Sequence, residues 1–135
     1  MKTTINEYYV SLEVAKLLKE AGFDMEGISY YQNGIFYQYL INRERIIIMN
    51  HNSAPNYMEQ YSAPTLEVAQ RWLREIKGIF ICTTPEIKDY QATWNFYICD
   101  EQGLFYENED CFLTYEEAQE IGIKKALELI LEKGE

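Results

Sequence analysis

Histidine, proline and cysteine are all scarce in this chain of 135 residues, which has one, three and three of them. The lone His51 leaves no histidine-based metal cluster. The three cysteines are Cys82, Cys99 and Cys111. Their odd number, their long spacings and the absence of a CxxC motif do not support a zinc or disulfide framework. Reduced thiols are typical of cytoplasmic proteins, so we expect a cytoplasmic protein without metal or cofactor.

Positive charge is also scarce, with 12 Lys and Arg against 22 Asp and Glu and a net charge of -10. Binding to nucleic acid requires a basic stripe that releases counterions, and none is present. No apolar run approaches the roughly 18 residues of a membrane span, and the first 14 residues lack the apolar core of a signal peptide. We expect no direct nucleic-acid binding and no membrane contact. The acidity fits either a basic protein partner or simple solubility.

Tyrosine is abundant, with twelve copies in a chain that is 15% aromatic. Tyrosine suits the rim of a β-rich core, and it is also enriched at protein interfaces. Both interpretations stay open. The candidate partner-contact residues are two tyrosines of an alternating segment and two of the irregular stretch 50–64: Tyr37, Tyr39, Tyr57 and Tyr61. A loop of that length inside a compact domain is a candidate recognition loop.

Three segments have the pattern of helices. Residues 11–21 begin with a capping Ser11 and end before Gly22, and residues 65–77 follow Pro64 and end before Gly78. Residues 114–132 begin with a Thr and a Glu at the spacing of a capping box. We therefore expect three helices, with a weak point at Gly122 inside the last one.

The segments between the helices favour strands. Asn33-Gly34, the strongest short hairpin signal, separates predicted strands over residues 28–32 and 35–41. Further strands are predicted over residues 45–49, 79–83, 93–99 and 104–107. Pro85 is expected to end the strand over 79–83, because proline cannot donate to a strand ladder.

These patterns predict a single compact α+β domain over residues 1–135, with antiparallel meanders and three helices packed on them. Residues 11–15 (SLEVA) and 65–69 (TLEVA) are nearly identical, and each leads into a helix, a glycine and strands. One interpretation is two α-β-β-β halves followed by a C-terminal helix. The other is that capped helix starts converge on similar short strings.

No motif of known chemistry is present in the sequence. It has no GxGxxG, Walker A, HExxH or GxSxG string. His51 with a cysteine or carboxylate brought close by the fold is the one catalytic arrangement that remains open. The acidic clusters at residues 100–101 and 107–110 do not match a calcium-loop template, and solvated carboxylates at turns are the simpler interpretation. We therefore identify no catalytic, cofactor-binding or metal residue.

Two stretches carry a resemblance. Residues 63–79 (APTLEVAQRWLREIKGI) and 114–127 (TYEEAQEIGIKKAL) resemble motifs of short uncharacterised proteins from gut Bacteroidetes and their prophages or mobile elements. That family has no function to carry over. The C-terminal part, with strands followed by residues 111–118 (CFLTYEEA), is also similar to the end of HicB-type antitoxins, although no strand is expected after the helix here.

The sequence thus favours a non-enzymatic binding or accessory protein that acts by protein–protein contact and comes from a phage or mobile element. Its partner would be another protein or a second copy of the chain. Two alternatives remain open: a HicB-like antitoxin or regulator, and a small hydrolase that uses His51.

Overall fold

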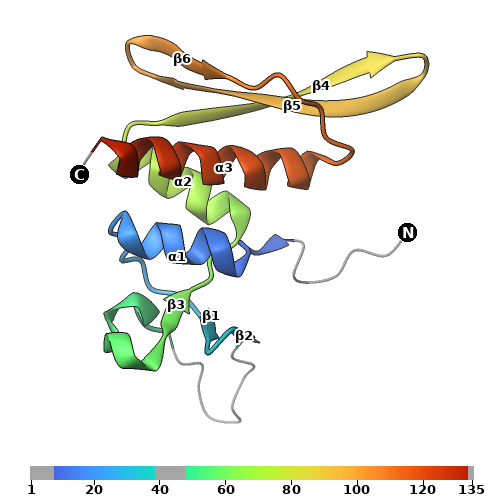
Figure 1. Ribbon diagram of the computed structural model, residues 1–135. Coiled ribbons are helices and arrows are strands. Elements are labelled where there is room, and N and C mark those ends of the chain that lie inside the picture. Colours follow the sequence, from blue (N-terminus) through green and yellow to red (C-terminus); the bar gives the residue numbers. More distant parts are fainter. Residues whose placement is uncertain (1–7, 39–47, 134–135) are drawn as a thin grey trace. The chain divides into compact units, whose positions relative to one another are not determined.

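The computed structural model describes residues 8–38 and 48–133 (Figure 1). Contacts within the chain divide it into two compact units, Met1–Thr65 and Leu66–Glu135, which we call the N-terminal and C-terminal units. The expectation of one compact domain over residues 1–135 stays a prediction.

The described residues form three α-helices and two three-stranded antiparallel sheets, so the α+β class is confirmed. The N-terminal unit contains α1 (Leu12–Glu20), β1 (Ser29–Gln32), β2 (Ile35–Gln38), the 3-10 turns η2 (His51–Ser53) and η3 (Asn56–Met58), and β3 (Gln60–Ser62). The C-terminal unit contains α2 (Leu66–Ile76), β4 (Phe80–Lys88), β5 (Gln91–Asp100), β6 (Gly103–Glu107) and α3 (Tyr115–Glu132).

All three predicted helices are confirmed, and two of them begin at the predicted cap. The Ser11 hydroxyl accepts a hydrogen bond from the Val14 amide at 3.3 Å, and the Thr114 hydroxyl accepts one from the Glu117 amide at 3.0 Å. These bonds satisfy first-turn amides that have no partner within the helix. None of the helices in the described part of the chain is long and apolar enough to cross a membrane.

The sheet of the N-terminal unit has the order β2-β1-β3. The predicted Asn33-Gly34 hairpin is confirmed: φ is 53° at Asn33 and 83° at Gly34, and Gln32 pairs with Ile35 across the turn. Positive φ at both positions is what a two-residue hairpin turn of this twist requires. β3 returns beside β1. In the C-terminal unit the third strand lies beside the second, in the order β4-β5-β6, so a helix precedes three strands in both units but the strand orders differ.

The irregular stretch 50–64 proved more ordered than its composition suggested. It contains η2, η3 and β3. β3 was not predicted because three residues are too few to show an alternating pattern in the sequence. The predicted strand 35–41 is described as far as Gln38, and 39–47 lies outside the described residues. Of the predicted strand 45–49, Met49 forms an isolated antiparallel bridge with Gly27.

The sheet of the C-terminal unit is a meander in the order β4-β5-β6, with α3 packed on one face. Ile81, Phe96 and Ile98 are buried in the sheet, and Ile123 and Leu127 are buried on α3. Gly122 allows the close approach, because a Cβ atom there would lie 2.9 Å from Ile81 Cγ2 and 3.3 Å from the Phe96 ring. The glycine that weakens the helix is therefore required by the packing.

The prediction that Pro85 ends a strand was wrong, because β4 continues to Lys88. Pro85 pairs with Trp94, whose amide donates to Phe112 O on the side of β5 away from β4. The Pro85–Trp94 pair therefore exchanges no ladder hydrogen bonds, and the missing N–H of Pro85 faces the free edge of β4. Proline is tolerated at such a position, where it also discourages pairing with another strand.

Candidate functional site

The three candidate tyrosines that the structure describes do not lie together on one face. Tyr37 pairs with Tyr30 across β1 and β2, its ring stacks on the Tyr30 ring at 5.4 Å, and it is 44% exposed. Tyr61 pairs with Tyr31 on the opposite face of the same sheet, where the ammonium of Lys19 lies 5.0 Å from the centre of its ring. Tyr61 is thus engaged within the N-terminal unit, whereas Tyr37 is open to a partner.

Tyr57 lies in η3 and is 85% exposed, which makes it the most accessible of the three that the structure describes. Tyr39 lies outside the described residues. The stretch around Tyr57 is fixed by its neighbours: the Asn52 side chain donates to Phe23 O at 2.9 Å and accepts from the Ser62 amide at 2.8 Å. The predicted recognition loop is therefore an anchored surface that presents one tyrosine.

His51 is buried, only 1% exposed. Its ring stacks on Tyr30 at a centroid distance of 4.4 Å, and Nε2 lies 3.0 Å from Gly27 O. Burial lowers the pKa of His51, while its hydrogen bonds to Gly27 and Gln60 oppose that change. A general base must reach its substrate. A ring enclosed in this way instead holds η2 against the sheet.

Two of the three cysteines lie on the outer face of the C-terminal sheet, opposite to α3. Cys82 pairs with Tyr97 across β4 and β5, and Cys99 lies two residues further along β5. Burial, with the neighbouring Cys82, raises the pKa of the Cys99 thiol, so the unreactive protonated form dominates at neutral pH. The described part of the chain contains no group of three His, Cys, Asp or Glu side chains able to hold a metal ion.

The clearest feature that sequence reasoning missed is the projecting end of the β4–β5 hairpin. We call residues 84–92 the arm; each of them is exposed. Figure 1 shows the turn of this hairpin beyond the N-terminal end of α3. Ile87 is 73% exposed and Tyr90 is 105% exposed. An isolated two-stranded hairpin is only marginally stable in water. The projecting arm therefore contributes little to the stability of the folded unit.

The turn of the arm places side chains where glycine is preferred. Asp89 has a φ of 55° and Tyr90 a φ of 62°, both in the left-handed region. Asp tolerates this region, but a bulky residue there costs on the order of 1 kcal/mol or more. A fully exposed tyrosine in a strained conformation contributes no burial that offsets this cost.

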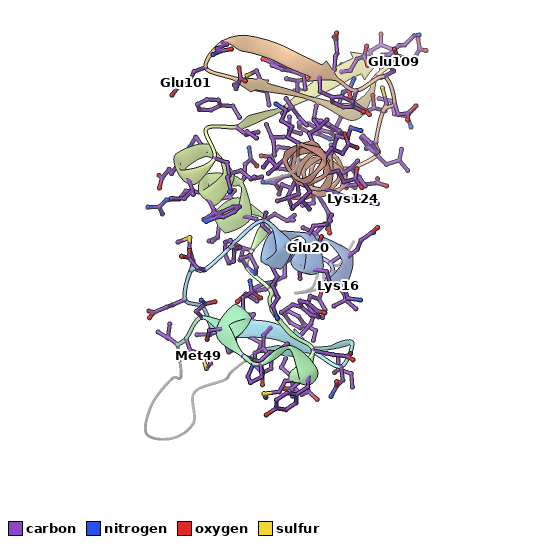
Figure 2. All side chains as sticks on the ribbon, turned by 60° about the vertical axis from the view of Figure 1, so that its left-hand side comes forward. Lys16, Glu20, Met49, Glu101, Glu109 and Lys124 are labelled. Carbon is purple, nitrogen blue, oxygen red and sulfur yellow. The ribbon has the colours of Figure 1, made fainter. Side chains whose placement is uncertain are left out.

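Acidic side chains surround the arm. It carries Glu86 and Asp89 against a single base, Lys88. The segment after β6 brings more carboxylates to its base, because Phe112 exchanges two 2.8 Å hydrogen bonds with Trp94. Exposed Glu107 ends β6, and exposed Glu109 and Asp110 lie in the segment itself. Figure 2 shows Glu109 at the periphery of this sheet. The thiol of Cys111 donates to Glu86 at 3.3 Å and links the segment to the arm.

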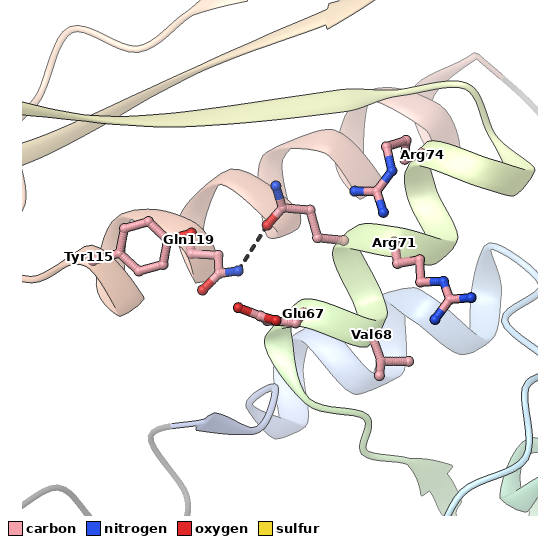
Figure 3. Close-up of a pocket in the computed structure, with 7 residues that line it drawn as sticks. Glu67, Val68, Arg71, Arg74, Tyr115 and Gln119 are labelled. Atoms are coloured by element: carbon pink, nitrogen blue, oxygen red, sulfur yellow. Dashed lines mark hydrogen bonds between the residues drawn. The ribbon is translucent and has the colours of Figure 1, made fainter.

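A polar groove of about 390 Å³ lies between α2 and α3 (Figure 3). Its lining is dominated by charged, amide and phenol side chains: Glu67, Val68, Gln70, Arg71, Arg74, Tyr115 and Gln119. Gln119 is 3% exposed, and its Nε2 donates to Gln70 Oε1 at 2.9 Å. The Tyr115 ring contacts Trp94 edge-on at 5.3 Å, which connects the groove to the base of the arm.

Comparison with known proteins gave no relative: no family model, no curated protein and no solved structure matches the chain.

Proposed function

We propose that this chain is a non-enzymatic, cytoplasmic binding protein of phage or mobile-element origin that acts by contact with another protein. The arm is its principal contact, and the partner presents a basic surface. The observation that carries this proposal is the conformation of Tyr90, which is fully exposed at the tip of the arm with a φ of 62°. Tyrosine is among the residues that supply most binding energy at interfaces.

Charge supports a basic partner. The C-terminal unit holds 15 Asp and Glu against seven Lys and Arg, a net charge of -8, whereas the N-terminal unit holds seven against five, a net charge of -2. A concentrated negative field accelerates encounter with a positively charged surface and suppresses binding to acidic proteins. Tyr90 and Ile87 would then form the apolar centre of the contact, and the carboxylates its rim.

Affinity purification from the native host, with the wild-type chain and two variants, tests this proposal. The arm variant carries Ile87→Ser and Tyr90→Gly, and the matched control carries Tyr57→Ser, which removes a similarly exposed tyrosine from the N-terminal unit. We expect one basic protein to be recovered with the wild type and with the control. Its recovery should fall at least about tenfold with the arm variant, a loss of about 1.4 kcal/mol in binding.

Salt provides the second readout. Recovery of the partner should decline as ionic strength rises, because rim charges are screened over about 10 Å at 0.1 M salt. Equal recovery of the same partner by the wild type and the arm variant would contradict the proposal, and so would an acidic partner. A HicB-like antitoxin would also bind a basic protein, so the identity of the partner separates a toxin from other classes.

A further inference from the structure

We infer that the α2–α3 groove receives an arginine side chain of the partner protein, with its guanidinium held between Glu67, Gln119 and Tyr115. This inference rests on the proposed function and adds a second recognition site to it. An arginine site in the groove would require an arginine on the contact surface of the partner, whereas the arm alone specifies no particular residue.

The orientation of the Gln70 and Gln119 amides is fixed by a chain of hydrogen bonds. Ile81 O can only accept, so the group of Gln70 that lies 2.8 Å from it must be the donating Nε2. Gln70 Oε1 is then an acceptor, and its partner at 2.9 Å must be the donating Nε2 of Gln119. The remaining atom, Gln119 Oε1, accepts no hydrogen bond from any described residue.

A second acceptor points toward the same part of the groove. Figure 3 shows the Glu67 carboxylate directed toward the Gln119 amide, with the Tyr115 ring beside them. Glu67 makes no ion pair with a described residue. Two acceptors that face one space can share a single ligand donor, which would replace solvent there. A guanidinium supplies several N–H donors in one plane and also stacks on aromatic rings, so it matches this end of the groove better than an ammonium.

The opposite end of the groove carries positive charge and limits what can bind. Arg71 is paired with Glu75 at 3.3 Å, whereas Arg74 has no ion pair among the residues described. A second cation would be repelled there, while a carboxylate on the partner would pair with Arg74. The groove therefore fits one arginine with an acidic neighbour and disfavours a run of basic residues.

Titration of the isotope-labelled full chain with N-acetyl-arginine amide, followed by amide NMR shifts, tests the inference. The blocked ends leave the guanidinium as the only charge of this probe. N-acetyl-citrulline amide has nearly the same shape without the charge and serves as the control probe. We expect shifts at the groove residues of α2 and α3, with a dissociation constant on the order of 10 mM for such a small exposed ligand.

Two carboxylate variants, one on each helix, complete the test. Glu67→Gln should weaken binding of the arginine probe about fivefold, whereas Glu132→Gln, which removes an exposed carboxylate at the far end of α3 and outside the lining, should leave it unchanged. Unchanged binding in Glu67→Gln would overturn the inference. So would equal shifts with the citrulline probe, or no shift in the groove residues at about 100 mM arginine probe.

The inference and the proposed function fail separately. If the partner is recovered through the arm but the groove does not bind the arginine probe, only the inference is lost. If the arginine probe binds in the groove and substitution of the arm leaves recovery of the partner unchanged, the role of the arm is lost and the groove remains a site.

Discussion

The two units are built on different kinds of interior. The buried polar residues Ser29, His51, Gln60 and Ser62 all lie in the N-terminal unit, whereas Gln119 is the single one assigned to the C-terminal unit among the described residues. In the N-terminal unit, the buried His51 and Gln60 hydrogen-bond to Gly27 and Gln32, and they lie in the same unit as a buried apolar core. The C-terminal unit relies on apolar packing of α3 on its sheet. None of the Asp and Glu residues described in this unit is buried, and the arm is exposed along its whole length.

The largest expected effect is on the packing of the C-terminal unit. Gly122→Leu should destabilise that unit by about 3 kcal/mol or more, because even a Cβ atom at this position would lie 2.9 Å from Ile81. Glu132→Leu, at the exposed end of the same helix, is the control and should change stability by about 0.5 kcal/mol or less. Hydrogen exchange should show lost protection in α3 and β5. A stable Gly122→Leu protein with unchanged exchange would contradict this account of the core.

A smaller effect is expected from acid, and it should fall on the N-terminal unit. The pKa of His51 is lowered in the folded state, so the unfolded chain binds more protons between that pKa and 6.5. Stability is complete above about pH 6.5 and declines as pH falls toward the lowered pKa. Hydrogen exchange between about pH 7.5 and 5 should show extra opening of β1 and β3, relative to α3. His51→Gln should remove this difference; equal pH dependence in both units would count against it.

The smallest expected effect has the opposite sign. Tyr90→Gly should stabilise the C-terminal unit by about 1 kcal/mol, because glycine adopts a φ near 60° without strain. Thermal unfolding of the variant and of Tyr57→Gly, at a position without this strain, measures the difference. A Tyr90→Gly protein that is less stable than the wild type would show that the tyrosine serves folding. The expected gain also means that lost binding in the arm variant cannot be attributed to unfolding at this position.

The helices and the first hairpin could be predicted because their signals are local. Ser11 and Thr114 cap helices through bonds three residues away, and Asn33-Gly34 sets its own turn. The arm was missed because the effect of Pro85 depends on which side of β4 carries the partner strand, and Asp89-Tyr90 is not a turn signal. The alternation of Thr84, Glu86 and Lys88 continues past the proline and could have indicated a longer strand.

The groove could not be predicted for a different reason. The Gln70–Gln119 hydrogen bond joins residues 49 positions apart, and neither glutamine is unusual for a helix. Likewise, the exposure of Tyr90 and the engagement of Tyr61 with Lys19 depend on tertiary contacts that composition does not contain. Abundant tyrosine indicated an interface in general, but only the fold distinguishes the tyrosines that are available.

The comparison of the two units can be tested directly by photo-crosslinking in the native host. A benzophenone side chain replaces Tyr90 in one protein and Tyr57 in the other, two exposed positions in different units. The account predicts that position 90 yields one discrete adduct with a basic protein, while position 57 yields little or none. A discrete adduct from position 57 and none from position 90 would contradict it.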